Sequence, residues 1–270
     1  MLREPDRRAE FEELAERLGA RLGEVVPVGW GDADATHHLS LADGRALAAR
    51  RFHGSGARAE VARIARLMTR LAETGLPVPP TAMLETARAH WLLTAWVDGD
   101  TGASWLGDTD RGRHLADRMG SLARRLRAVD VRGVDLGDGP ATNLRQRDPL
   151  DRIAFVHGDF APVNVVVGAD GEIAALLDFE HSGTGPALLD AAWWGWVVRH
   201  HHPEAWTAAW PTFLAAAGIE PGHVEVRLHE LVLRTLASRA AGAVDDAAQR
   251  QWQDRLRAAR TWSVPRDQAT

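Results

Sequence analysis

The segment 155–180 constrains the fold of this chain more than any other part of the sequence. A short apolar run leads into His157, Gly158 and Asp159, and Asn164 follows the aspartate by five positions. An aspartate and an asparagine at that spacing fit on one tight loop, although Asn164 by itself could simply cap a turn. The sequence therefore predicts a short polar loop that carries both side chains.

A β-hairpin is predicted directly after this loop. Apolar runs at 163–167 and 173–177 flank a Gly-Ala-Asp-Gly turn, a pattern typical of two paired strands. The second run ends at Asp178, so the hairpin returns this carboxylate to the loop of Asp159 and Asn164. Two carboxylates and an amide then converge, which is what phosphoryl transfer requires: a base for a hydroxyl proton and oxygen ligands for Mg²⁺.

The residues before this segment alternate between strand and turn patterns. Short strands are expected at 25–29, 36–41 and 45–52, and the turn residues between them favour an antiparallel meander. Helical spacing of apolar residues predicts one short helix at 10–18 and a longer one at 57–73, which ends before a cluster of prolines.

A boundary between two lobes is expected at the Asp-Gly pair 98–99. The residues after it are mostly helical in pattern, with an apolar stripe at 115–129 and further helices over 188–262. We therefore expect an α+β fold in which 1–97 forms a small, strand-rich lobe and 98–270 forms a larger helical lobe.

Composition excludes several other kinds of protein. The 270 residues include no cysteine, which rules out disulfides and thiolate metal sites, and the formal net charge of -5 is unlike that of a general nucleic-acid binder. All 32 residues of the lysine and arginine class are arginine, so a phosphate loop that needs lysine cannot form. No signal-peptide core or membrane-spanning run is recognisable. We expect a cytoplasmic protein that binds neither nucleic acid nor membranes.

The motif His-Gly-Asp-x-x-x-x-Asn followed by Asp-Phe-Glu resembles the catalytic loop and Asp-Phe-Gly motif of protein kinases. The glycine and the glutamate make it similar to the aminoglycoside phosphotransferase and choline kinase family, over about residues 25–192. This resemblance implies a two-lobed, protein-kinase-like fold. It also implies that Asp159 is the catalytic base and that Asn164 and Asp178 are Mg²⁺ ligands.

The same resemblance implies two supporting roles. His157 would brace the loop from within, and Asp190, twelve residues after the hairpin aspartate, matches the residue that ties the loop down in this family. The chain departs from the family at 185–187, which read Gly-Pro-Ala where members usually carry Gly-Asp-Pro before that aspartate.

Arg50 is the expected phosphate-binding residue of the first lobe. The run Leu-Ala-Ala-Arg at 47–50 fits the Val-Ala-Ile-Lys pattern of kinases, with arginine in place of lysine. Ala48 and Arg50 share one face of the strand, where the small side chain leaves room for a base and the guanidinium meets phosphate. Arg51 is expected to point the other way, into solvent.

Glu60 is the expected partner of Arg50. It opens the helix after the strand, and no other acidic residue lies between positions 43 and 73. In kinases an acidic residue on this helix pairs with the basic residue of the strand. The family's glutamate tends to fall about one turn later, and a solvated glutamate favoured by the helix dipole is the alternative.

Two further parts of the nucleotide site are expected from position alone. Gly31 lies in a turn that occupies the place of the nucleotide-covering loop, although the Gly-x-Gly-x-x-Gly series is incomplete. Thr94, Ala95, Trp96 and Val97 should form the hinge whose backbone meets the purine edge. This stretch does not distinguish ATP from GTP.

The expected reaction is transfer of the γ-phosphate of ATP or GTP to a hydroxyl of a small molecule. An antibiotic is the first expectation for the acceptor; acidic residues of the second lobe would attract a cationic one such as an aminoglycoside, but they fit a solvated helical face equally well. These residues are Glu204, Glu220, Glu225, Glu230, Asp245 and Asp246. The alternatives are a kinase of choline, homoserine, thiamine or a sugar, and a nucleotide-binding pseudokinase, which only Arg50 in place of lysine favours.

Two aromatic clusters in the second lobe leave more than one interpretation open. Five tryptophans are too many for one core stripe, so some must lie at the surface or line the cleft, while core packing accounts for the rest. They are Trp193, Trp194, Trp196, Trp206 and Trp210. The three histidines at 200–202 would point in different directions on a helix, so a surface helix end is expected in place of a metal site.

Overall fold

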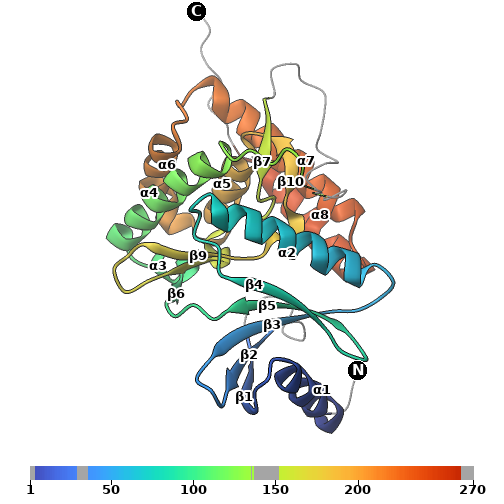
Figure 1. Cartoon of the computed structure of the whole chain (residues 1–270). Coiled ribbons are helices and arrows are strands. Elements are labelled where there is room, and N and C mark those ends of the chain that lie inside the picture. Colours follow the sequence, from blue (N-terminus) through green and yellow to red (C-terminus); the bar gives the residue numbers. More distant parts are fainter. Residues whose placement is uncertain (1–3, 29–35, 135, 137–151, 263–270) are drawn as a thin grey trace, which may run out of the picture. The chain divides into compact units, whose positions relative to one another are not determined.

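The chain folds into two compact units, Met1–Asp98 and Gly99–Thr270 (Figure 1). The structure is a computed structural model. It describes residues 4–28, 36–134, 136 and 152–262. The predicted turn that contains Gly31 lies outside these residues.

A five-stranded antiparallel sheet forms the centre of the first unit, with the strand order β1-β2-β3-β5-β4. The strands are β1 (Leu22–Pro27), β2 (Thr36–Leu41), β3 (Ala46–Phe52), β4 (Thr81–Glu85) and β5 (His90–Ala95). The predicted meander is confirmed for the first three strands. The edge strand β4 was missed, because it follows a proline cluster and prolines argue against a strand.

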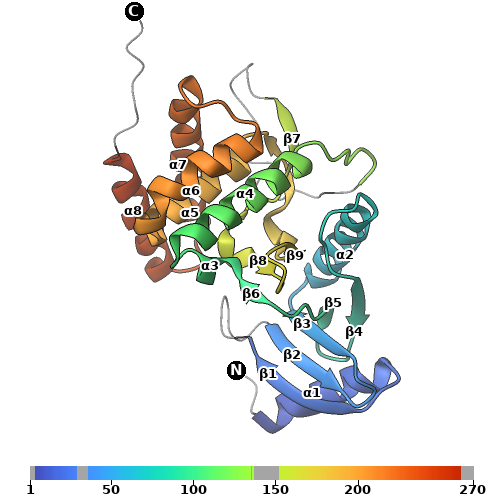
Figure 2. The same ribbon diagram turned by 90° about the vertical axis from the view of Figure 1, so that its left-hand side faces the viewer.

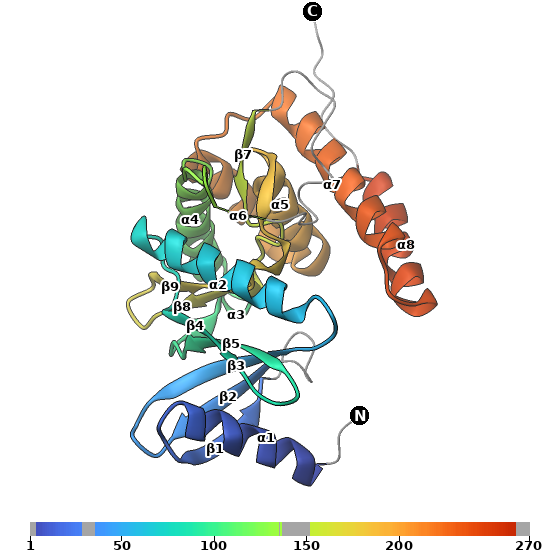
Figure 3. The same ribbon diagram turned by 45° about the vertical axis from the view of Figure 1, so that its right-hand side comes forward.

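Two helices pack against this sheet, α1 (Glu4–Arg17) and α2 (Ala57–Glu73), and Figures 1 and 3 show them on opposite faces. Phe11 and Leu14 of α1 pack with Leu39, Ala49 and Trp91 from three strands. On the other side, α2 buries the apolar stripe that the sequence predicts, with each of the side chains at most 3% exposed. These side chains are Val61, Ile64, Leu67, Met68 and Leu71.

Arg51 does not point into solvent as the sequence predicts. Because α1 covers its face of the sheet, its Nη2 lies 3.3 Å from Oε1 of Glu10, whose side chain is 2% exposed. A carboxylate buried to this degree needs a partner, since an unpaired buried charge is strongly destabilising. The alternation of the strand therefore sends Arg50 to the opposite face, where α2 packs.

Five larger helices make up most of the second unit. They are α4 (Thr109–Leu126), α5 (Leu189–His201), α6 (Pro203–Ala217), α7 (His223–Ala241) and α8 (Asp246–Arg260), with the short α3 at Gly102–Trp105. In Figure 2, α4 runs beside α6, and a Cβ at Gly120 would meet the carbonyl oxygen of Phe213 at this close approach. Helices α7 and α8 form a long hairpin (Figure 3).

Two small sheets position the polar loop within this unit. The predicted hairpin is confirmed as β8 and β9, with Val165 opposite Leu176, and β6 adds a third strand. A second pair, β7 and β10, was missed because the latter is short and rich in glycine. The bounds are β6 (Asp100–Thr101), β7 (Ile153–Val156), β8 (Val165–Val167), β9 (Ile173–Leu176) and β10 (Gly183–Pro186).

The architecture confirms the expected fold class, an α+β protein with an antiparallel sheet in the first unit and a mainly helical second unit. Across the described segments, every helix is too short or too polar to span a membrane.

Candidate active site

Residues 157–164, named here the HGD loop, connect β7 to the hairpin of β8 and β9. Gly158 occupies this loop with φ +78°, and a Cβ on it would collide with the carbonyl oxygen of His181. Only glycine adopts such a backbone without strain and also allows so close an approach. The glycine of the motif is therefore a structural requirement of this turn.

Asp190 ties the HGD loop to the first turn of α5. Its two carboxylate oxygens accept hydrogen bonds from the N–H groups of His157, at 2.8 Å, and of Gly158, at 2.9 Å. The residue is only 1% exposed. Burial raises the pKa of Asp190, and the two N–H bonds act against that shift. The aspartate takes the part that the motif predicts for it, without contributing to the open surface of the site.

His157 braces the same loop from inside the protein. The fully buried ring places Nε2 2.9 Å from the carbonyl oxygen of Leu177, and Nδ1 accepts the N–H of Asp159 at 3.3 Å. A neutral imidazole with its proton on Nε2 satisfies both contacts. The ring thus links the HGD loop to the end of β9.

Asp159, Asn164 and Asp178 are brought together as the sequence spacing suggests. The Asn164 Nδ2 group donates to the backbone oxygen of Asp159 at 2.8 Å and to its Oδ2 at 3.0 Å. The N–H of Leu177 donates to the carbonyl of Asn164 at 2.9 Å, which places the next residue, Asp178, beside this loop. Asp178 has φ +65°, unlike every other described non-glycine residue, and backbone strain of this kind is concentrated at functional sites.

Arg239 of α7 completes the surroundings of Asp159, and sequence reasoning missed it. Its Nη2 donates to Oδ1 of Asp159 at 2.8 Å and to the carbonyl of Gly158 at 3.2 Å. The guanidinium also lies 4.2 Å from the ring centre of Trp193 and 5.3 Å from that of Trp252. No local pattern marks this arginine, which is 80 residues away from Asp159 in the chain.

These neighbours keep Asp159 ionised. Burial alone would raise its pKa, but the neighbouring groups, chiefly the charge of Arg239, outweigh burial and lower the pKa. Burial in turn lowers the pKa of His181, and Arg239 repels its charged form. Asp159 is therefore a carboxylate at neutral pH that can accept a proton.

A cavity of about 210 Å³ opens beside Asp159 and Asn164. Three helices supply most of its walls, and we name it the tryptophan cavity. Its defining side chains are Trp193, Trp196 and His201 of α5, Arg239 of α7, and Trp252 and Arg255 of α8.

The residues expected at the nucleotide lie in the first unit. Ala48 and Arg50 alternate with Ala49 along β3 and lie opposite Thr94 and Leu92 of β5. Arg50 places its guanidinium carbon 5.9 Å from the ring centre of Phe52.

Glu60 has a partner on its own helix. Its two oxygens accept hydrogen bonds from Nη2 and Nε of Arg63, at 2.6 and 3.0 Å. Residues three apart on a helix are neighbours, which explains the pair. The pairing of Glu60 with Arg50 stays a prediction.

The expected hinge residues follow the end of β5. The N–H of Ala95 donates to Pro80 at 2.9 Å, and the N–H of Trp96 donates to Ala46 at 3.0 Å. The Trp96 ring packs on His38, with the ring centres 4.3 Å apart. Thr94 belongs to the sheet, and Val97 follows it without regular structure.

A family model described as the phosphotransferase enzyme family matches residues 24–154 and 141–229. These matches include the sheet of the first unit, the HGD loop, the hairpin and α5. The chain belongs to the phosphotransferase enzyme family. The resemblance carried by the His-Gly-Asp and Asp-Phe-Glu motifs is thereby confirmed at the level of the family.

Solved structures with a similar fold support the architecture of this phosphotransferase. A macrolide 2'-phosphotransferase from Brachybacterium faecium is 19% identical with a TM-score of 0.67, covering 97% of this chain and 100% of that one. An aminoglycoside 2'-phosphotransferase-IIIa in complex with GDP is 14% identical with a TM-score of 0.69, covering 93% and 97%. At these identities the likeness concerns the fold. No match was found among curated proteins.

The oxygen donors of the phosphotransferase fit a magnesium ion. Because Asn164 commits its NH₂ group to Asp159, its amide oxygen faces away from that carboxylate, and Asp178 follows the strand bonded to the same residue. Carboxylate and amide oxygens are the hard ligands that Mg²⁺ prefers, and it commonly takes few protein ligands beside phosphates and water.

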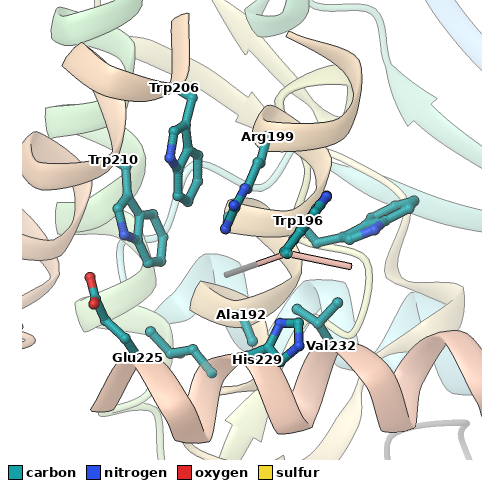
Figure 4. Close-up of a pocket in the computed structure, with 11 residues that line it drawn as sticks. Ala192, Trp196, Arg199, Trp206, Trp210, Glu225, His229 and Val232 are labelled. Atoms are coloured by element: carbon teal, nitrogen blue, oxygen red, sulfur yellow. The ribbon is translucent and has the colours of Figure 1, made fainter. Parts of the chain in front are cut away.

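The phosphotransferase has a second cavity, of about 250 Å³, lined mainly by residues of α5, α6 and α7. Figure 4 shows Trp206 and Trp210 of α6, Arg199 of α5 and Glu225 of α7 around it. The five tryptophans are thus divided between the core and the two cavities. Trp194 is fully buried in the core, and Trp196 lines both cavities.

Proposed function

We propose that this phosphotransferase moves the γ-phosphate of ATP or GTP to a hydroxyl of a small molecule, with Asp159 as the catalytic base. The observation that carries the proposal is the position of the Asp159 carboxylate, which is held by Asn164 and Arg239 and lines a cavity. A base must be deprotonated and within reach of the acceptor hydroxyl, and this carboxylate meets the first condition and adjoins a space for the second.

Three residues of the HGD loop and two residues beside it have separate tasks in the proposed reaction. Asp159 accepts the hydroxyl proton as the acceptor oxygen bonds to the γ-phosphorus, while the bond to the bridging oxygen breaks and the nucleoside diphosphate leaves. Asn164 and Asp178 would hold Mg²⁺, which when bound neutralises charge on the phosphates. His157 and Asp190 position the loop and contact no substrate. Proximity and charge stabilisation supply most of the catalysis in such reactions.

We also propose that residues 1–97 bind the nucleotide and that 98–270 carry catalysis and the acceptor. Arg50 would pair with phosphates, Ala48 would leave room for the base, and Glu60 would hold Arg50 once the nucleotide is bound. The backbone of 94–97 would meet the purine, with Gly31 in the covering loop. A nucleotide donor is supported by similar structures that are GDP complexes.

An antibiotic is the proposed class of acceptor, and a metabolite alcohol is the alternative. The antibiotic proposal is supported by similar structures described as macrolide and aminoglycoside phosphotransferases, one of them a kanamycin complex. Those antibiotics differ widely in size and charge, so the choice between them depends on the cavity of this chain and not on the fold.

Replacing the proposed base tests the function directly. In an assay of nucleoside-diphosphate release with ATP and GTP over antibiotics and metabolites, Asp159→Ala should lower kcat by roughly 10³-fold, within the usual range for loss of a general base. Nucleotide affinity, measured by calorimetry, should change little. Asp170→Ala, in the exposed hairpin turn, is the matched control and should keep full activity. Substantial turnover by Asp159→Ala would reject the role; tight nucleotide binding without any acceptor would favour a pseudokinase.

A further inference from the structure

The walls of the tryptophan cavity present hydrogen-bond donors and hardly any acceptors. Guanidinium and indole groups donate but cannot accept, and they belong to most of the described polar side chains that line the cavity. Asp159 is the only carboxylate among the described residues that line the cavity, and Arg239 and Asn164 already bond to it. A molecule that fills this space must therefore bring acceptor oxygens of its own.

Two of these donors are buried without a partner. The Nε1–H groups of Trp193 and Trp196 bond to no atom in the described part of the protein, although the two residues are 3% and 2% exposed. A buried donor without a partner is destabilising, because it has lost its hydrogen bond to water. Both residues line the cavity, and their rings stack with centres 4.6 Å apart. A ligand oxygen that reaches either N–H group from the cavity would satisfy it.

Arg239 forms an ion pair with Asp159, whereas Arg255 forms none with a carboxylate among the described residues that line the cavity. Its guanidinium carbon lies 4.4 Å from the ring centre of Trp252 and 6.0 Å from that of Trp196. Burial lowers the pKa of Arg255, and the charge of Arg239 lowers it further. The two guanidinium groups repel each other, and a bound anion would relieve that repulsion.

Apart from Asp159 and the amide oxygen of Asn164, no described side chain in the wall is expected to attract a cation. His201 has its pKa lowered to about 4, chiefly by burial and then by His200 and Arg255, so the ring is neutral at pH 7. The acidic residues that could have favoured a cationic acceptor line other surfaces, and Glu225 faces the second cavity. A polycation such as an aminoglycoside would meet two arginines here, and the repulsion between like charges disfavours its binding.

We propose that the acceptor of this enzyme carries an anionic group, such as a carboxylate, on a planar or apolar body. The anion contacts Arg255 and the indole N–H groups of Trp193 and Trp196, the body packs on the indole rings, and the hydroxyl reaches Asp159. The inference rests on the proposed function for the role of that hydroxyl. At about 210 Å³ the cavity is smaller than the roughly 300–1,000 Å³ of drug-sized sites. It therefore suits a small acceptor or one arm of a larger one.

Calorimetry without nucleotide tests the proposal with three probes. 3-Phenyllactate carries a hydroxyl, a ring and a carboxylate; 3-phenyllactamide has a neutral amide in place of the carboxylate; kanamycin is a polycation. The whole protein should bind the acid at least tenfold more tightly than the amide. Arg255→Gln should abolish that preference, and Arg250→Gln, on the exposed side of the same helix, should keep it. Circular dichroism of both variants confirms that they are folded.

Equal binding of the acid and the amide, tighter binding of kanamycin, or no measurable preference for the acid at millimolar concentration would overturn the proposal. Binding to Asp159→Ala separates this inference from the proposed function. That variant should lose phosphoryl transfer but bind 3-phenyllactate as tightly as the wild type or more tightly, because a nearby negative charge is gone. If the wild-type protein binds 3-phenyllactate with this preference but transfers no phosphate, only the proposed function is refuted.

Discussion

The HGD loop and the tryptophan cavity lie side by side, but the hydrogen-bond donors of the two regions differ in whether the protein supplies their acceptors. In the loop, the N–H groups of His157, Gly158 and Asp159 and the Asn164 amide all have protein acceptors. In the cavity wall, the indole N–H groups of two buried tryptophans have none among the described residues. The protein itself satisfies these donors of the loop, whereas it leaves the two indole donors of the wall available to a ligand.

This difference separates positioning from recognition. A satisfied polar network in a buried place is rigid, because each group that moved would lose its partner. Such rigidity suits a catalytic base, because its carboxylate must keep one position relative to the acceptor hydroxyl. Unsatisfied donors carry a cost in the free protein that binding removes, which suits discrimination between ligands. Arg239 joins the two regions, since it bonds to Asp159 and lies on the rings of the wall.

The largest effect should come from breaking the loop at Asp190. Asp190→Ala leaves the N–H groups of His157 and Gly158 buried without acceptors, at a cost of about 2–5 kcal/mol in unfolding free energy. Urea unfolding followed by circular dichroism measures it. Asp246→Ala, in the first turn of α8 and exposed, should cost less than about 1 kcal/mol. A loss below about 1 kcal/mol for Asp190→Ala would show that the loop holds without this tie.

An intermediate effect is expected where the two regions meet. Arg239→Met keeps the length of the side chain and removes the charge that lowers the pKa of Asp159. Because a base with a lowered pKa works down to low pH and fails as pH falls through that pKa, the acid limb of kcat/KM should move to higher pH. kcat at pH 8 should fall roughly 10- to 100-fold through misplacement of Asp159.

The pH dependence distinguishes this role from a purely structural one. Arg250→Met, on the exposed side of α8, should leave both the acid limb and kcat where they are. If Arg239→Met lowers the rate by the same factor at every pH, Arg239 does not act through the pKa of Asp159.

The smallest effect is expected from replacing Trp193 in the wall of the tryptophan cavity. Trp193→Phe deletes an N–H group that bonds to no described atom, so unfolding free energy should change by less than about 1 kcal/mol, while KM for an anionic acceptor rises roughly 3- to 10-fold. Trp194→Phe is the matched control, because its N–H donates to Sδ of Met119 at 3.1 Å in the core. It should cost stability and leave KM unchanged. The reverse pattern would place the recognition elsewhere.

Local spacing was enough to predict the centre of the site. The five-residue separation of Asp159 and Asn164, and a hairpin that ends at Asp178, bring three polar groups together whatever surrounds them. The strands β2 and β3, the helix α2 and the fold class follow from the same kind of short-range pattern. The edge strand β4 and the pair β7 and β10 carry weak patterns, and only their partners make them strands.

The sequence by itself determined the HGD loop, because backbone geometry over a few residues leaves a motif of this spacing little choice. Only the tertiary structure decided what stands around it. Arg239, Trp252 and Arg255 come from helices whose packing no local pattern specifies, and Glu10 takes Arg51 out of solvent because α1 lies over that face of the sheet. Contacts between residues far apart in the chain depend on how whole helices pack, so the charge of the cavity, and with it the class of acceptor, becomes visible only in the folded protein.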